Sequence, residues 1–206
     1  MTWSLQTPSM TVSLAVLPFP HVSTPPADTP DREHQLVAAA QGGERRAFAE
    51  LVRLHQRRAY AVARAIVLSH EDAEDVVQEA FFHAYRALDR FIPGQAFGAW
   101  LHRIVANAAL DVTRRRKVRE TDELSDAHAS PFRDPAESDE LRTRLRHALG
   151  ALPARQRAVI VLHDVEGYRH ADIGRLLDMP EGTARSDLHH ARATLRAALN
   201  DLRSDP

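Results

Sequence analysis

Hydrophobic residues recur at three- and four-residue spacing over three consecutive stretches in the first half of the chain, which indicates three amphipathic α-helices. The first stretch runs from about residue 48 to 67. The second begins at Ser69, whose spacing to Asp72 is that of a capping box, and ends at Pro93. The third covers about 96–117. Each stretch has one apolar face, so the three helices are predicted to enclose one small core.

Shorter helices are predicted in the second half of the chain. A break at Gly167 precedes a short helix, and a turn at 178–180 separates that helix from the final long one. This order is the pattern of a helix-turn-helix motif. At about 100° per residue, one side of the final helix is apolar. Its positions are Ala184, Leu188, Ala191, Leu195 and Ala198. Ser186 and His189 therefore lie on the opposite, exposed side.

Proline and charge divide the chain of 206 residues, although its net charge is only −1. Residues 1–30 hold six of the twelve prolines and are predicted to be a disordered N-terminal extension. Residues 120–140 hold eight acidic residues and one basic residue, the composition of a flexible acidic linker. The predicted fold is all-α, with two small helical domains at 42–119 and 141–203, both in basic stretches of the chain.

Several classes of chemistry are unsupported by the composition. Cysteine is absent, which excludes disulfides and thiol catalysis and fits a reducing cytoplasm. The twelve histidines form no pair at i, i+4, and the eight glycines form no phosphate-binding loop. No apolar stretch approaches the roughly 18 residues that a membrane span requires. We therefore expect a cytoplasmic protein that is not an enzyme, with no metal, no cofactor, no small-molecule substrate and no direct membrane insertion.

Two segments of the chain are EDAEDVVQEAFFHAYRALDRF at 71–91 and FGAWLHRIVANAALDVTRRRK at 97–117. Both resemble region 2 of bacterial sigma factors of the extracytoplasmic-function (ECF) group. Residues 151–199 resemble region 4 of the same group, in the usual order. The resemblance implies a sigma factor that binds core RNA polymerase and directs promoter-specific initiation of transcription. It also implies promoter DNA and an anti-sigma factor as partners.

The resemblance implies that the second helix binds the coiled coil of the largest subunit of the polymerase. The residues concerned are Asp75, Val76, Gln78, Glu79 and Phe82. The third helix, with the loop before it, would open and read the minus-ten element. Its residues are Trp100, Arg103, Asn107, Arg114 and Arg115. A stacking ring, an amide and cations on one face suit a single-stranded ligand.

Each of these assignments has an ordinary structural alternative. Trp100 could be a residue at the edge of the core, and the basic run that follows Thr113 could be a solvated helix end. The polar residues of the second helix could be a plain exposed face. Only the complete string DAEDVVQEAF favours the polymerase assignment over that alternative.

The same resemblance implies that the final helix reads the minus-thirty-five element, and its position in a helix-turn-helix suits the major groove. Its candidate residues are Thr183, Arg185, Ser186, His189 and Arg192. Asp187 and His190 depart from the family, because relatives usually carry basic residues there, and phosphate affinity should fall accordingly. Asp187 lies roughly 120° from the centre of the exposed face, near the positive end of the helix, so it need not repel DNA.

Two other functions are compatible with parts of this pattern. A helix-turn-helix regulator could bind duplex DNA without polymerase and use residues 42–119 for dimerisation. An anti-sigma or adaptor module would have no role at DNA, and it would not need the arginines of the final helix.

Overall fold

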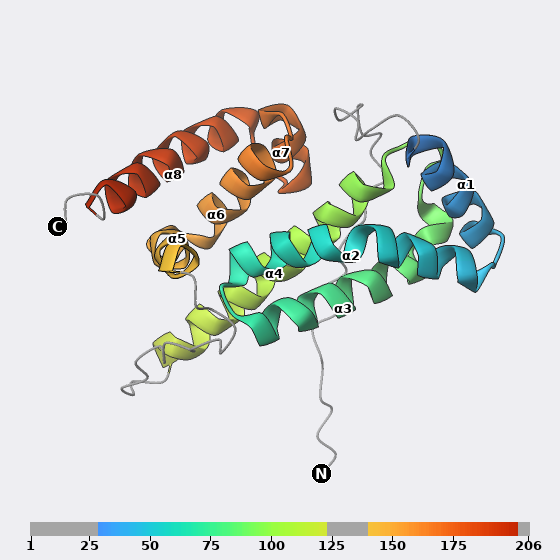
Figure 1. Ribbon diagram of the computed structural model, residues 1–206, viewed down its shortest axis with the longest axis horizontal. Coiled ribbons are helices and arrows are strands. Elements are labelled where there is room, and N and C mark those ends of the chain that lie inside the picture. Colours follow the sequence, from blue (N-terminus) through green and yellow to red (C-terminus); the bar gives the residue numbers. More distant parts are fainter. Residues whose placement is uncertain (1–28, 123–139, 202–206) are drawn as a thin grey trace, which may run out of the picture.

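Helices account for the regular secondary structure in residues 29–122 and 140–201, the parts of the chain that the computed structural model describes. The elements are α1 (Thr29–Gln41), α2 (Arg45–Val67), α3 (His70–Arg86), the 3₁₀-helix η1 (Leu88–Arg90), α4 (Phe97–Asp122), α5 (Glu140–Gly150), α6 (Ala154–Ile160), the π-helical turn η2 (Val161–Val165), α7 (His170–Leu176) and α8 (Glu181–Asp201) (Figure 1). We call α1 to α4 the first unit and α5 to α8 the second unit. The all-α prediction is confirmed.

The first unit is built around α2, which packs against α3 and α4. Leu68 adopts a left-handed conformation (φ 65°) and ends α2, with its N–H donated to the carbonyl of Arg64. Ser69 then caps α3, because its hydroxyl accepts a hydrogen bond from the Asp72 N–H at 3.3 Å. The predicted start of the second helix is thereby confirmed.

Helix α1 was not predicted, because it follows a proline-rich stretch and precedes the expected domain start at residue 42. It packs along α2 and buries Val37 and Ala40. The first unit therefore begins earlier than the hydrophobic pattern indicated. Residues 1–28 of the predicted extension lie outside the described residues.

The second unit contains the predicted helix-turn-helix, formed by α7 and α8. The turn depends on two residues. Asp178 takes a left-handed conformation (φ 52°), which aspartate tolerates better than most residues. Gly174 leaves room for the returning chain, because an added Cβ would lie only 2.8 Å from the Met179 carbonyl oxygen. These features hold α8 across α7 and α6.

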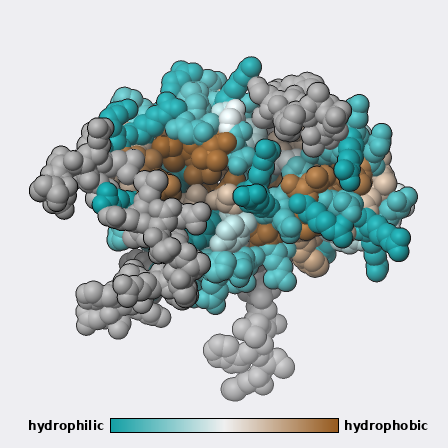
Figure 2. Space-filling view, viewed as in Figure 1, coloured by the Kyte–Doolittle hydropathy of each residue, from teal (hydrophilic) through white to brown (hydrophobic). Residues whose placement is uncertain are grey.

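The two ends of the predicted acidic linker are helical, since α4 continues to Asp122 and α5 begins at Glu140. Residues 123–139 lie outside the described part of the chain. In the described part, no helix combines the length and the apolar character needed to cross a membrane. The face in Figure 2 is largely hydrophilic, with smaller hydrophobic patches between polar areas.

The two units pack against each other, an arrangement that the sequence pattern did not predict. Helix α6 contacts α2 and α4, and α7 contacts α4. Figure 1 accordingly shows the second unit beside α2 and α4, with α3 on the far side of α2. One continuous cluster of buried hydrophobic residues extends through both units. We refer to this contact as the inter-unit interface.

Candidate nucleic-acid interface

Helix α3 has a sharp division between a buried and an exposed side, as its sequence spacing requires. Ala73, Ala80 and Ala84 are fully buried, whereas the predicted polymerase-binding residues lie on the outside, with one exception. The exposed ones are Asp75, Gln78, Glu79 and Phe82. Val76 is fully buried, so its assignment to this surface is wrong, and it belongs to the core beneath.

Phe82 dominates the exposed side of α3, because 57% of this large apolar side chain is exposed. The Arg86 guanidinium lies 5.6 Å from the centre of its ring, and His83 approaches Glu79 at 3.4 Å. An aromatic side chain ringed by polar and charged groups is typical of a residue that anchors a protein partner. Helix α3 thus offers one anchor with a polar surround.

Trp100 does not present its ring to solvent. It is 6% exposed and packs against Phe91 and Phe97, with ring centres 5.2 and 5.6 Å away. The structure therefore matches the alternative of a core-edge residue. A role in reading DNA stays a prediction, and it would require the aromatic cluster to rearrange.

The polar residues of α4 lie on a side of the helix different from its core side. Arg103 and Asn107 are half-buried, and Arg114 and Arg115 are exposed. Arg114 pairs with Asp111 at 3.0 Å, one turn earlier on the same helix. The cationic end of α4 is therefore accessible to a phosphate, although Arg114 already has a carboxylate partner.

Helix α8 has the orientation that its sequence predicted. Ala184, Leu188 and Ala191 are buried, and the predicted DNA-contacting residues lie on the other sides of the helix. Arg185, Ser186, His189 and Arg192 are exposed, and Thr183 is half-buried. The second helix of the helix-turn-helix thus presents donors and cations to solvent, as a major-groove reader must.

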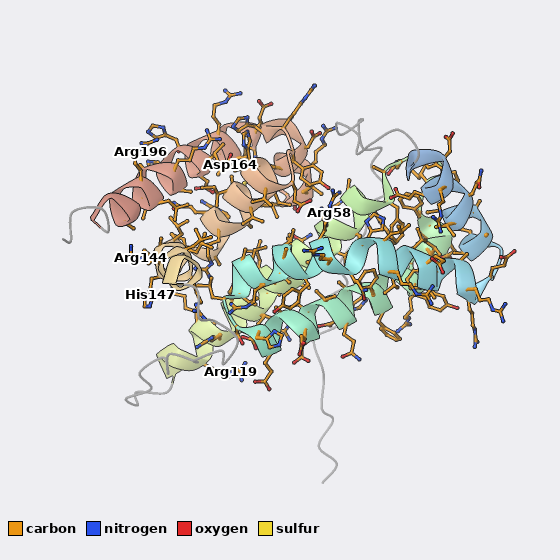
Figure 3. All side chains as sticks on the ribbon, in the orientation of Figure 1. Arg58, Arg119, Arg144, His147, Asp164 and Arg196 are labelled. Carbon is orange, nitrogen blue, oxygen red and sulfur yellow. The ribbon has the colours of Figure 1, made fainter. Side chains whose placement is uncertain are left out.

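Two arginines of this surface are paired with carboxylates of the same chain. Arg185 Nη2 lies 2.7 Å from Glu181 Oε1. Arg192 Nε donates to Asp164 Oδ2 at 3.1 Å, and the Arg192 side chain lowers the pKa of Asp164 below its ordinary value. Figure 3 shows Asp164 beside α8. A DNA phosphate must compete with these carboxylates for the two guanidinium groups.

Asp187 lies away from the exposed side of α8, as expected from its angle on the helix. Its carboxylate is buried and accepts two hydrogen bonds from Arg155 of α6, at 2.7 and 3.3 Å. No pattern in the sequence indicates Arg155 as this partner. Asp187 therefore joins α8 to α6 within the second unit and lies off the side of α8 that carries the predicted DNA contacts.

The inter-unit interface contains buried polar groups that pair across it. His102 Nδ1 of α4 lies 3.0 Å from the Tyr168 hydroxyl, and Glu166 Oε2 lies 3.9 Å from the same nitrogen. Burial, followed by the charges of His55 and Arg58, lowers the pKa of His102 to about 3. Figure 3 shows Arg58 on α2. His102 is therefore neutral at physiological pH.

A second polar contact joins the units at the end of α2. Arg157 of α6 is buried and donates from Nε to the Ile66 carbonyl oxygen at 2.8 Å. This carbonyl lies in the last turn of α2, where helical partners are missing. On α4, His102 lies roughly 140° from Asn107 at about 100° per residue, so this interface and the predicted minus-ten surface occupy different sides.

Comparisons with known proteins match both units. Residues 51–119 match Sigma-70 region 2, and residues 142–195 match Sigma-70 region 4. The chain is 40% identical over 168 residues to the ECF RNA polymerase sigma factor SigM of Mycobacterium tuberculosis, covering 82% of this chain and 85% of the relative. It is 34% identical over 173 residues to the ECF RNA polymerase sigma-E factor of Escherichia coli, covering 78% and 90%.

Solved structures agree with these matches. CnrH, solved in complex with the cytosolic domain of CnrY, gives a TM-score of 0.63 at 30% identity and covers 83% of this chain and 99% of that chain. The sigma factor RpoE of Bartonella quintana, solved with the anti-sigma factor NepR, gives 0.62 at 27% identity and covers 74% and 96%. The chain belongs to the sigma-70 family, in its extracytoplasmic-function group. Its function is to direct promoter-specific initiation of transcription by RNA polymerase.

Proposed function

We propose that this sigma factor binds core RNA polymerase through the exposed side of α3, with Phe82 as the anchor. The observation that carries the proposal is the separation of that helix into a fully buried apolar side and an exposed side made of Asp75, Gln78, Glu79 and Phe82. The inter-unit interface lies at α2 and α4 and leaves α3 accessible. Polymerase can therefore make its first contact without separating the units.

We propose that α4 and the loop before it bind the minus-ten element, and that α8 binds the minus-thirty-five duplex. Two cationic surfaces on one chain support this division. The two DNA elements are centred about 25 base pairs apart, which is roughly 85 Å of duplex at 3.4 Å per base pair. With a rise of about 1.5 Å per residue, α4 is only about 39 Å long. Because this span of duplex is about twice the length of α4, the longest described helix, we expect the packed units to separate before both elements are bound.

The chain supplies binding and no covalent chemistry, so specificity rests on differences in binding free energy. We propose that it acts in the cytoplasm, where polymerase and promoter DNA are found. An anti-sigma factor is a further proposed partner, since the similar RpoE structure contains one. Such a partner would inhibit the chain by covering α3, α8 or both.

A mobility-shift experiment tests this function against a regulator that acts without polymerase. A promoter fragment is incubated with the chain alone, with core polymerase alone and with both. We expect a stable, sequence-specific shift only with both proteins, because the packed units cannot span the two elements. An equally specific shift with the chain alone would support the alternative regulator, which the match of residues 51–119 to region 2 does not favour.

A further inference from the structure

Helix α1 lies outside the segment that matches Sigma-70 region 2, which begins at residue 51. It nevertheless contacts α2, α4 and η1. Two of its polar side chains, Glu33 and Gln41, make hydrogen bonds to the chain on either side of the loop at 92–96. This is the loop that connects η1 to α4, at the proposed minus-ten surface.

Glu33 holds the far end of the loop. Its Oε1 accepts a hydrogen bond from the Phe97 N–H at 3.0 Å, and its Oε2 lies 2.8 Å from His55 Nε2. The Phe97 N–H is the first of α4 and has no partner within its own helix, so the carboxylate caps α4 from 64 residues away. Burial opposes ionisation of Glu33, but the hydrogen bonds from His55 and Phe97 give a net lowering of its pKa. Glu33 is therefore an ionised cap.

Gln41 holds the near end of the same loop. Its Nε2 group donates to the Leu88 carbonyl oxygen at 2.8 Å and to the Phe91 carbonyl oxygen at 2.9 Å. Both protons of the amide are therefore used on the chain that enters the loop. Glu33 and Gln41 are eight residues apart on α1, a rise of about 12 Å, so one rigid helix fixes both ends of the loop.

The loop itself has features of a preorganised binding element. Gly94 has a φ of 87°, a conformation that residues with side chains rarely adopt. Gln95 is 9% exposed, and its Nε2 has no hydrogen-bond partner among the described residues. Such a donor is costly to bury without a partner, and the fold keeps it buried in this loop. Holding the loop in advance also avoids ordering it during binding.

We propose that α1 is a positioning element for minus-ten recognition, in which Glu33 and Gln41 clamp the two ends of loop 92–96 in the conformation that discriminates between bases. This inference rests on the proposed function of α4 and its loop. Neither residue touches DNA in this proposal. Each acts through the backbone of the loop, which distinguishes it from the predicted contact residues of α4.

The test measures how strongly holoenzyme prefers a nontemplate minus-ten single strand over a base-scrambled strand. Gln41→Met removes both donated hydrogen bonds at nearly constant length, and Glu33→Gln removes the charge of the cap. We expect each variant to lower the preference by about tenfold, the scale of one or two lost hydrogen bonds. Gln35→Met, on the exposed side of α1, is the matched control and should retain the full preference.

Affinity for core polymerase and for a minus-thirty-five duplex is measured on the same preparations, with thermal unfolding to identify any variant that fails to fold. If Glu33→Gln fails to fold, Gln41→Met alone tests the clamp. Gln41 is only half-buried, so its replacement is expected to leave the fold intact. An unchanged preference in Gln41→Met would overturn the clamp, as would an equal loss of minus-thirty-five binding, which indicates general destabilisation. If wild-type holoenzyme shows no preference, the proposed function of α4 fails instead.

Discussion

Protonation of His102 should open the inter-unit interface. The packed state holds this imidazole 3% exposed, between the Tyr168 hydroxyl and the Glu166 carboxylate, with Arg58 and His55 near enough to act on its charge. Its pKa is lowered from 6.5 to about 3 in that state. Separation of the units returns the ring to water and to an ordinary pKa. The open state then binds the proton more tightly, so falling pH favours opening.

The magnitude follows from linkage between protonation and opening. Because the pKa is lowered in the packed state, the contribution of His102 to packing is complete above pH 6.5. It is lost as pH falls below 6.5 towards 3. Between pH 7.5 and 5.5 the free energy that favours the packed state over the open state falls by about 1.4 kcal/mol. This corresponds to roughly a tenfold increase in the opening equilibrium constant.

Energy transfer between two dyes measures this equilibrium. The chain has no cysteine, so Glu74→Cys on α3 and Ala197→Cys on α8 give two unique, exposed labelling positions. We expect the ratio of open to packed molecules to grow by about tenfold between pH 7.5 and 5.5. The control is His102→Asn, whose amide can still bond to Tyr168 but does not titrate. A shift of equal size in His102→Asn, or no shift in wild type, would refute the reasoning.

Three further predictions concern other sites. Asp164→Asn releases Arg192 from its carboxylate partner. We expect the minus-thirty-five duplex to bind about threefold to tenfold more tightly, with a salt dependence steeper by about one phosphate contact. Anisotropy titrations at several salt concentrations measure both quantities. Unchanged affinity and slope would contradict this. Asp187→Asn weakens the pairing with the half-exposed Arg155 and should lower the free energy of unfolding, measured by chemical denaturation, by about 1 kcal/mol. A variant as stable as wild type would argue against a structural role for Asp187. Phe82→Ser should leave the melting temperature nearly unchanged but weaken binding of core polymerase by about 30-fold in a competition assay, and undiminished binding would remove Phe82 as the anchor.

The helices with long apolar stripes could be predicted from the sequence. In α2, α3 and α8 the buried residues recur with the helical period, so one face of each is defined without tertiary information. Among the side chains of α1 that the structure describes, Val37 and Ala40 are the buried ones, and the helix follows a run of prolines. Its stability comes from packing against α2 and from Glu33 and Gln41, and such contacts leave no periodic signal.

The exposed sides of α3 and α8 could be predicted from the sequence, but the side chains that pair with residues on these helices could not. The angle of Asp187 on α8 placed it off the exposed side, yet nothing near it in sequence indicates Arg155, 32 residues earlier. Trp100 lies at the boundary of the apolar stripe of α4, where periodicity does not decide between core and surface. His102 and Tyr168 are separated by 66 positions in the sequence, and Ile66 and Arg157 by 91 positions. Single polar pairs at such distances have no sequence pattern.

Run-off transcription from a promoter library is the most direct test of the central claim, that one chain joins polymerase to two promoter elements. Purified chain and core polymerase are mixed with templates in which the minus-ten region, the minus-thirty-five region or both are scrambled. We predict specific transcripts only from templates that retain both elements, and none above background from core polymerase alone. Transcription that does not depend on the chain, or that persists when both elements are scrambled, would contradict the account.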